Sequence, residues 1–119
     1  VTVITYGYGV HIAKEVLSSV NDISADLIDL RTLVPLDKNM IFESVKKTNK
    51  VIILHEDTLT GGFGAEVSSL ISEFCFEYLD APIVRAASMD TPVPFAANLE
   101  NQFLPKDRFK KKLLDLLNY

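Results

Sequence analysis

Short apolar runs alternate along this 119-residue chain with longer segments whose apolar residues recur at helical spacing. Four of the runs predict strands, at residues 1–6, 24–30, 51–54 and 83–87. The other segments predict helices over residues 10–20, 38–47 after an N-cap at Asp37, 63–78 and 105–117, with a weak helical turn over 95–103. Strands that alternate with helices form parallel sheets with right-handed crossovers. The sequence therefore predicts an α/β fold, a three-layer αβα sandwich with a mostly parallel sheet of about four strands and helices on both faces.

The composition narrows the class of function. A net charge of −4 argues against a general nucleic-acid binder, and no apolar run approaches the roughly 20 residues that span a bilayer, so neither nucleic acid nor a membrane is an expected partner. Cys75 is the only cysteine, and its place between Phe74 and Phe76 predicts a packed thiol in a reducing compartment. No repeat or linker divides residues 1–119, and the chain starts directly in a predicted strand. We therefore expect one domain, excised from a longer protein.

The helical spacing also predicts which side chains face the sheet. We expect the second helix to turn Met40, Ile41 and Val45 inwards. The third helix is expected to bury an apolar stripe formed by Phe63, Val67, Leu70, Ile71, Phe74 and Tyr78.

The carboxyl ends of parallel strands meet at one edge of a sheet, and α/β proteins place their binding sites there. The loops expected at this edge are residues 6–9, 31–35, 55–62 and 88–94. Gly7 and Gly9 follow a strand, but Ile12 stands where a dinucleotide-binding fingerprint needs its third glycine. No P-loop occurs either, so nucleotide binding is disfavoured.

His55, Glu56 and Asp57 place a base beside two carboxylates, a combination that could serve acid–base catalysis. We favour a structural interpretation, in which His55 ends the third strand and Glu56 pairs with Arg31. A metal site is disfavoured because His11 is the only other histidine.

Arg31 leaves two roles open. Its guanidinium could clamp a carboxylate or phosphate of a ligand. It could equally lock its own loop to a neighbouring one through Glu56 or Asp90.

Three blocks of sequence carry a resemblance to a known family. They are IDLRTLVPLD at 28–37, HEDTLTGGFGAEVSSLISE at 55–73 and APIVRAASMDTPVPFA at 81–96. In this order and spacing, over essentially all 119 residues, the chain resembles the transketolase C-terminal-like domain of the β subunit of thiamine-diphosphate-dependent 2-oxoacid dehydrogenases. The Leu-Thr-Gly-Gly run is closer to the branched-chain or acetoin type than to typical pyruvate enzymes.

The resemblance implies a parent enzyme that decarboxylates a 2-oxoacid on thiamine diphosphate with Mg and passes the acyl group to a lipoyl arm. It assigns catalysis and cofactor binding to other domains, so this domain is expected to hold no catalytic residue, cofactor or metal. The implied partners are the α subunit, a second β subunit and the lipoyl acyltransferase core, which would dock near Asp80 and Tyr119. The implied location is the bacterial cytoplasm, or the mitochondrial matrix in a eukaryote.

The edge of the sheet at which the strands end, which we call the strand-end edge, is accordingly predicted to be a subunit interface. Gly61 and Gly62 remove side chains where a helix start must approach another backbone closely, and Phe63 is expected to be an apolar anchor. A bulky residue at position 62 is expected to weaken assembly and to leave the domain folded. The full predicted interface comprises Arg31, His55, Glu56, Leu59, Gly61, Gly62, Phe63 and Asp90.

Two alternatives remain open from the sequence. One is the matching domain of a transketolase or deoxyxylulose-phosphate synthase. The other is a free-standing small-ligand-binding α/β module that uses the strand-end edge, which an assay for phosphate or nucleotide binding would reveal.

Overall fold

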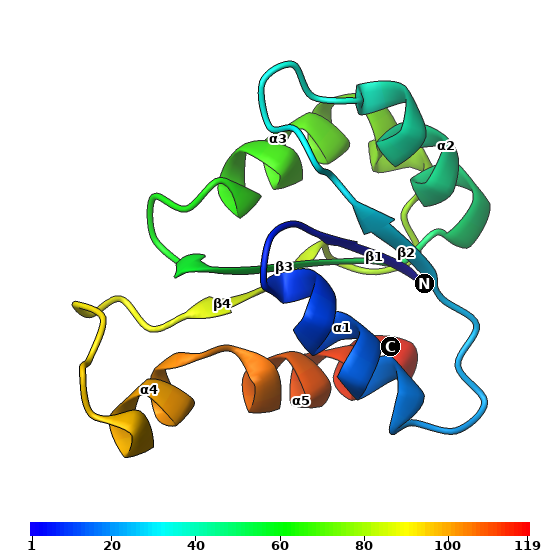
Figure 1. Ribbon diagram of the computed structural model, residues 1–119. Helices are drawn as coiled ribbons and strands as arrows, with labels where there is room; N and C mark the ends of the chain where they lie inside the picture. Colours follow the sequence, from blue (N-terminus) through cyan, green and yellow to red (C-terminus); the bar gives the residue numbers. More distant parts are fainter.

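The predicted strands form one parallel sheet in the computed structural model, which describes residues 1–119. The strands are β1 (Thr2–Thr5), β2 (Asp26–Asp29), β3 (Val51–Thr58) and β4 (Val84–Ser88), and their order across the sheet is β2-β1-β3-β4. In the parallel register Thr5 of β1 lies opposite both Asp29 and Leu54. All four strands therefore end at the same edge, on the left of Figure 1.

The helices cover both faces of the sheet (Figure 1). One side carries α1 (Gly9–Ser18), α5 (Lys106–Leu117) and, near the strand ends, the short α4 (Ala97–Phe103). The other side carries α2 (Lys38–Thr48) and α3 (Gly64–Cys75), and a 3-10 turn, η1 (Phe76–Tyr78), continues α3. The predicted αβα sandwich is confirmed.

The sheet divides the core into two apolar clusters. Val3 and Leu54 belong to the cluster under α1 and α5, whereas Ile4 and Ile53 belong to the cluster under α2 and α3. Neighbouring residues of a strand point to opposite faces, so β1 and β3 contribute side chains to both clusters. This double burial explains why these strands are continuous apolar runs rather than alternating ones.

Some side chains predicted to face inwards are exposed. In α2, Ile41 and Val45 are buried as predicted, but Met40 is 53% exposed. In α3 the buried residues Val67, Ile71 and Cys75 recur at intervals of four, which is a narrower stripe than predicted.

The prediction for the end of α3 was wrong for a related reason. Phe74 lies at the margin of the stripe, where its ring packs 5.3 Å from that of Phe42 and stays 52% exposed. The chain then tightens into η1, which turns Tyr78 away from the sheet. Cys75 is buried as predicted, and burial raises the pKa of its thiol.

The helix ends agree better with the sequence patterns. Asp37 caps α2, since its Oδ1 accepts a hydrogen bond from the Met40 N–H at 3.0 Å.

None of the helices has both the length and the apolar composition needed to cross a bilayer.

Candidate functional site

The strand-end edge is dominated by β3, which runs four residues beyond the predicted end at Leu54. Between Leu54, opposite Ala86, and Thr58, opposite Ser88, the register of β3 and β4 shifts. The shift is a bulge that takes in His55, Glu56 and Asp57. These three residues are therefore part of an irregular strand rather than of a loop.

His55 lies inside the protein and does not end a strand. Its side chain is fully buried, its ring stacks on Tyr6 with centroids 5.9 Å apart, and its Nδ1 lies 3.2 Å from the Asp57 carbonyl oxygen. Nε2 has no hydrogen-bond partner in the protein. Burial lowers the pKa of His55, so the ring is neutral near pH 7. A ring enclosed in this way is part of the packed interior and cannot reach a ligand at the surface.

The glycines beside this ring are explained by the chain itself. A Cβ on Gly62 would stand 2.6 Å from the His55 Cε1, and it would also press on the Thr58 carbonyl oxygen. Gly64, the first residue of α3, is equally tight against the same ring. Gly61 is different, because its φ of +76° favours glycine while nothing lies within 4 Å. The close approach predicted at Gly62 is thus made within the domain, whereas a contact with another subunit stays a prediction.

Asp90 fastens the loop after β4 to the loop after β3. Its two carboxylate oxygens accept hydrogen bonds from the Thr60 N–H at 2.9 Å and the Thr60 hydroxyl at 2.7 Å. These bonds hold the pKa of Asp90 below its usual value. Arg85 supports the same loop by donating to the Leu59 carbonyl oxygen at 3.1 Å.

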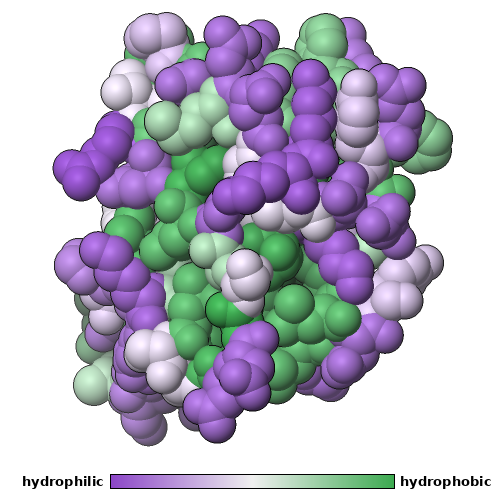
Figure 2. Space-filling model, turned by 90° about the vertical axis from the view of Figure 1, so that its right-hand side faces the viewer, coloured by the Kyte–Doolittle hydropathy of each residue, from purple (hydrophilic) through white to green (hydrophobic).

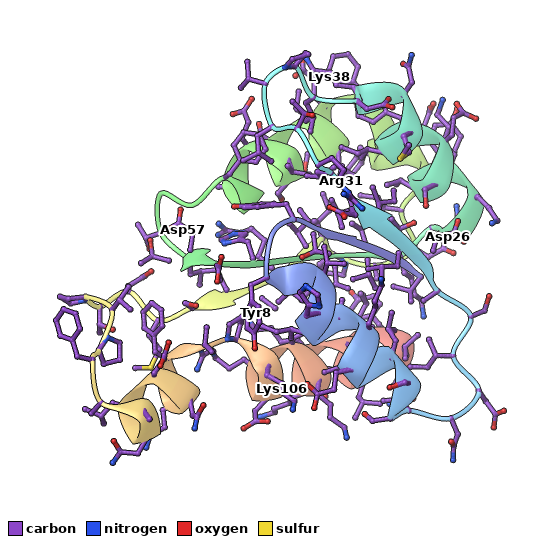
Figure 3. All side chains as sticks on the ribbon, viewed as in Figure 1. Tyr8, Asp26, Arg31, Lys38, Asp57 and Lys106 are labelled. Atoms are coloured by element: carbon purple, nitrogen blue, oxygen red, sulfur yellow. The ribbon has the colours of Figure 1, made fainter.

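Arg31 pairs with Asp29 and not with Glu56 or Asp90. Its Nε lies 2.7 Å from the Asp29 Oδ2, and its side chain is 85% exposed. Arg31 adopts the left-handed region at φ 49°, which folds it back on the end of its own strand. β1 separates β2 from β3, so the pairing predicted with Glu56 would have to cross about 10 Å. Figure 3 shows Arg31 beside the end of β2, apart from Asp57 near the end of β3.

The most exposed apolar side chains of this edge were not among the predicted interface residues. Phe63 is half-buried, and its ring meets that of Tyr6 edge-on at 6.2 Å. Phe95 is instead wholly exposed, at 105% of its reference area, and Val93 nearby is 62% exposed. Phe95 was assigned to a weak helical turn, and only its place after the prolines marked it as surface.

The opposite end of the sheet carries an open groove with a volume of about 780 Å³. We call it the Asp80 groove, and its lining includes Phe76, Asp80, Ala81, Pro82, Ile83 and Tyr119. The two residues that the resemblance placed at a docking site therefore line the same groove. Figure 2 faces this end of the molecule and shows hydrophobic side chains gathered in a hollow within a hydrophilic surround.

Asn49 positions the backbone beside this groove. It ends α2 in the left-handed region, at φ 61°. From there its Nδ2 donates to the Tyr78 carbonyl oxygen at 2.6 Å, and its own carbonyl oxygen accepts from the Asp80 N–H at 2.9 Å. The Asp80 side chain remains exposed.

The acidic, histidine and cysteine side chains do not gather into a metal site. No three His, Cys, Asp or Glu side chains converge as metal ligands would. A side chain would not fit at either glycine that opens a helix, since a Cβ on Gly9 would meet the Thr5 side chain and a Cβ on Gly64 would meet the His55 ring.

Comparison with known proteins shows one consistent set of relatives. Residues 1–108 match the family model described as the transketolase C-terminal domain. The 2-oxoisovalerate dehydrogenase subunit beta of Pseudomonas aeruginosa is 50% identical over 95 residues, which cover 80% of this chain and 27% of that protein. The pyruvate dehydrogenase E1 component subunit beta of Rickettsia felis is 41% identical over 109 residues, covering 90% and 33%. The chain thus spans about a third of the length of these relatives or less.

A solved structure shares the fold. It is described as a split gene transketolase in an inactive beta4 tetramer, and it superposes with a TM-score of 0.78 over 98% of this chain and 38% of its own. The sequence identity is 24%, so this match concerns the fold alone.

Proposed function

The chain belongs to the family of transketolase C-terminal domains, and we propose that it is the non-catalytic assembly and docking domain of the decarboxylating component of a 2-oxoacid dehydrogenase complex. The parent enzyme decarboxylates a 2-oxoacid on thiamine diphosphate and passes the acyl group to a lipoyl arm. In this proposal the domain holds the α subunit and a second β subunit together and presents a surface to the acyltransferase core. In this proposal the assembly surface comprises the predicted interface residues Arg31, His55, Glu56, Leu59, Gly61, Gly62, Phe63 and Asp90. His55 and Gly62 are buried and contribute by holding the backbone of this surface in place.

One observation carries this proposal. Two of the polar groups of the strand-end edge are engaged within the chain, since His55 is buried and Asp90 is hydrogen-bonded to Thr60, whereas Glu56 and Asp57 stay exposed. The exposed side chains of this edge also include apolar ones, with Phe95 the most exposed. An edge of this kind suits protein contact better than catalysis.

Thiamine diphosphate and Mg do not fit the residues of this domain. The cofactor needs a divalent cation held by oxygen ligands and a cradle for its pyrophosphate. The chain lacks a converging acidic set, and the space beside the glycines that open α1 and α3 is taken by Thr5 and His55. The proposal therefore assigns the cofactor to other domains of the parent enzyme.

We assign acyltransferase docking to the Asp80 groove. Asp80 and Tyr119 line this groove together, and Tyr119 is 72% exposed. An exposed carboxylate beside an apolar hollow suits a small folded partner with a basic side chain at its contact.

The relatives favour a dehydrogenase over the alternatives. Two named 2-oxoisovalerate dehydrogenase subunits are 46% and 50% identical to this chain, whereas the transketolase structure is 24% identical. Pyruvate dehydrogenase subunits are 41% and 48% identical, so the identities support a 2-oxoacid as the proposed substrate class of the parent, and only the Leu-Thr-Gly-Gly run favours a branched chain. The proposed location is the bacterial cytoplasm, or the mitochondrial matrix in a eukaryote.

Assembly and catalysis can be separated in the full-length subunit that carries this domain, co-expressed with its α-type partner. Deleting the domain is expected to abolish the heterotetramer in analytical ultracentrifugation. Glu56→Gln and Asp57→Asn are expected to alter the assembly constant at most and to leave the kcat of the assembled enzyme unchanged. A large fall of kcat in fully assembled enzyme would instead assign catalysis to this edge.

A further inference from the structure

The segment Met89–Leu99, which we call the arm, runs from the end of β4 into the first turn of α4 and carries several exposed apolar side chains. Met89 is 45% exposed, Val93 62%, Phe95 105% and Leu99 50%. Figure 1 shows the arm as the yellow segment that projects beyond the strand ends. Exposed apolar side chains that gather on one segment mark it as a candidate for protein contact.

The arm is held to the body of the domain at both ends. At its start, Asp90 accepts two hydrogen bonds from Thr60. Beyond its end, Arg108 donates to the Gln102 carbonyl oxygen at 2.9 Å and to the Ala87 carbonyl oxygen at 3.2 Å, so it ties α4 to the end of β4. Two prolines within the arm also fix the backbone φ. A segment restrained in this way loses little entropy when it binds.

The cations near the arm are engaged within the chain. Arg85 donates to the Leu59 carbonyl oxygen, Arg108 donates to the Ala87 and Gln102 carbonyl oxygens, and Lys106 pairs with Glu15. Glu56 and Glu100 line a hollow of about 450 Å³ beside the arm, and neither forms an ion pair. A partner surface that meets this edge is therefore expected to carry Lys or Arg.

We propose that the arm inserts Phe95 into an apolar pocket on the α-type partner subunit, and that Lys and Arg side chains of this pocket face Glu56 and Glu100. This inference rests on the proposed assembly function and names the contact that performs it. Phe95 serves as the anchor, because a rigid aromatic side chain that becomes fully buried typically dominates the energy of an interface.

A second copy of the same chain suits this edge less well. Each copy would bring the same acidic residues to a symmetric contact, since an isologous interface uses one patch twice. Like charges that face each other oppose such a contact. A basic partner removes this repulsion.

The test uses the full-length subunit and its α-type partner, with the Kd of assembly measured by titration. Phe95→Ser is expected to weaken assembly about 30-fold or more, the loss typical of an interface hot spot. Phe76→Ser is the matched control, because Phe76 is 76% exposed but lies at the Asp80 groove. Glu100→Lys is expected to weaken assembly several-fold and to reduce its dependence on salt. Thermal unfolding of the variants should match that of the parent chain, since Phe95 contributes no burial.

The outcomes distinguish this inference from the function on which it rests. If deletion of the domain abolishes assembly but Phe95→Ser leaves the Kd unchanged, the arm is not the anchor and the inference is overturned. If neither change affects assembly, the proposed function itself fails. If Phe95→Ser reduces only the self-association of the subunit, the occupant is a second copy, and the inference is again overturned.

Discussion

The two ends of the sheet use similar residue types in opposite ways. At the strand-end edge, His55 is buried under Tyr6 and the carboxylate of Asp90 is bonded to Thr60, so the polar groups hold the loops in place. At the other end, bonds from Asn49 to the backbone hold the Asp80 groove, and the Asp80 carboxylate is left exposed. A carboxylate is therefore informative about function only once its internal partners are known.

The largest expected effect lies at the strand-end edge, where the packing is tightest. Gly62→Ala places a methyl group against the Thr58 carbonyl oxygen and the His55 ring, and backbone cannot move aside cheaply. We expect the free energy of unfolding of the 119-residue chain to fall by about 3 kcal/mol, at the upper end for an overpacked site. Urea denaturation measures this loss. This prediction replaces the expectation from the sequence that a bulky residue at position 62 leaves the isolated domain folded.

Gly61→Ala is the matched control for that substitution. Its Cβ meets nothing within 4 Å, so only the left-handed backbone at φ +76° disfavours alanine, by about 1–2 kcal/mol. Equal losses at positions 61 and 62 would show that backbone conformation, and not contact with His55 and Thr58, sets the requirement for glycine.

The support of the Asp80 groove is tested at Asn49. Asn49→Ala removes the hydrogen bond to the Tyr78 carbonyl oxygen and places alanine at φ 61°, so a loss of about 2 kcal/mol is expected. Asn49→Gly keeps the backbone conformation available and should cost about 1 kcal/mol. Urea denaturation compares the two variants. If Asn49→Gly is no more stable than Asn49→Ala, the left-handed backbone at position 49 is not what makes alanine costly.

Docking at the Asp80 groove should respond to charge without a change in stability. Asp80→Asn keeps the size of the side chain and removes its charge, so we expect about tenfold weaker binding of the acyltransferase's subunit-binding domain, with a weaker dependence on salt. Calorimetric titration of the assembled enzyme measures this change. Glu100→Gln, at the opposite end of the molecule, should leave docking unchanged. Equal effects of the two substitutions would show a response to net charge and not to the groove.

The sequence predicted the architecture because burial on both faces makes the strands visible as apolar runs. The extension of β3 was not predictable in the same way, since His55, Glu56 and Asp57 resemble a polar loop until the bulge with β4 is known. The pairing of Arg31 with Glu56 failed because sequence patterns do not show that β1 lies between the two strands.

The candidate sites also differ in how far the sequence could predict them. Asp80 and Tyr119 came from the resemblance, and the fold brings them to one groove. Phe95 was missed because exposure is a property of the finished fold, and an aromatic residue beside prolines gives no periodic signal. Gly62 was predicted to meet another subunit, which stays a prediction, and the atoms that require a glycine there lie within its own chain.

The smallest expected effect concerns the buried His55 and depends on pH. Burial lowers the pKa of His55 in the folded chain, so below the ordinary value of about 6.5 the unfolded chain binds more protons. Its contribution to stability is therefore present above about pH 6.5 and is lost as the pH falls below that value. His55→Asn should remove this slope in urea denaturations below about pH 6.5. His11→Asn should keep it, because His11 is exposed on α1. If the slope survives in His55→Asn, other groups cause the acid sensitivity, and the enclosed ring is not what distinguishes the strand-end edge from the Asp80 groove.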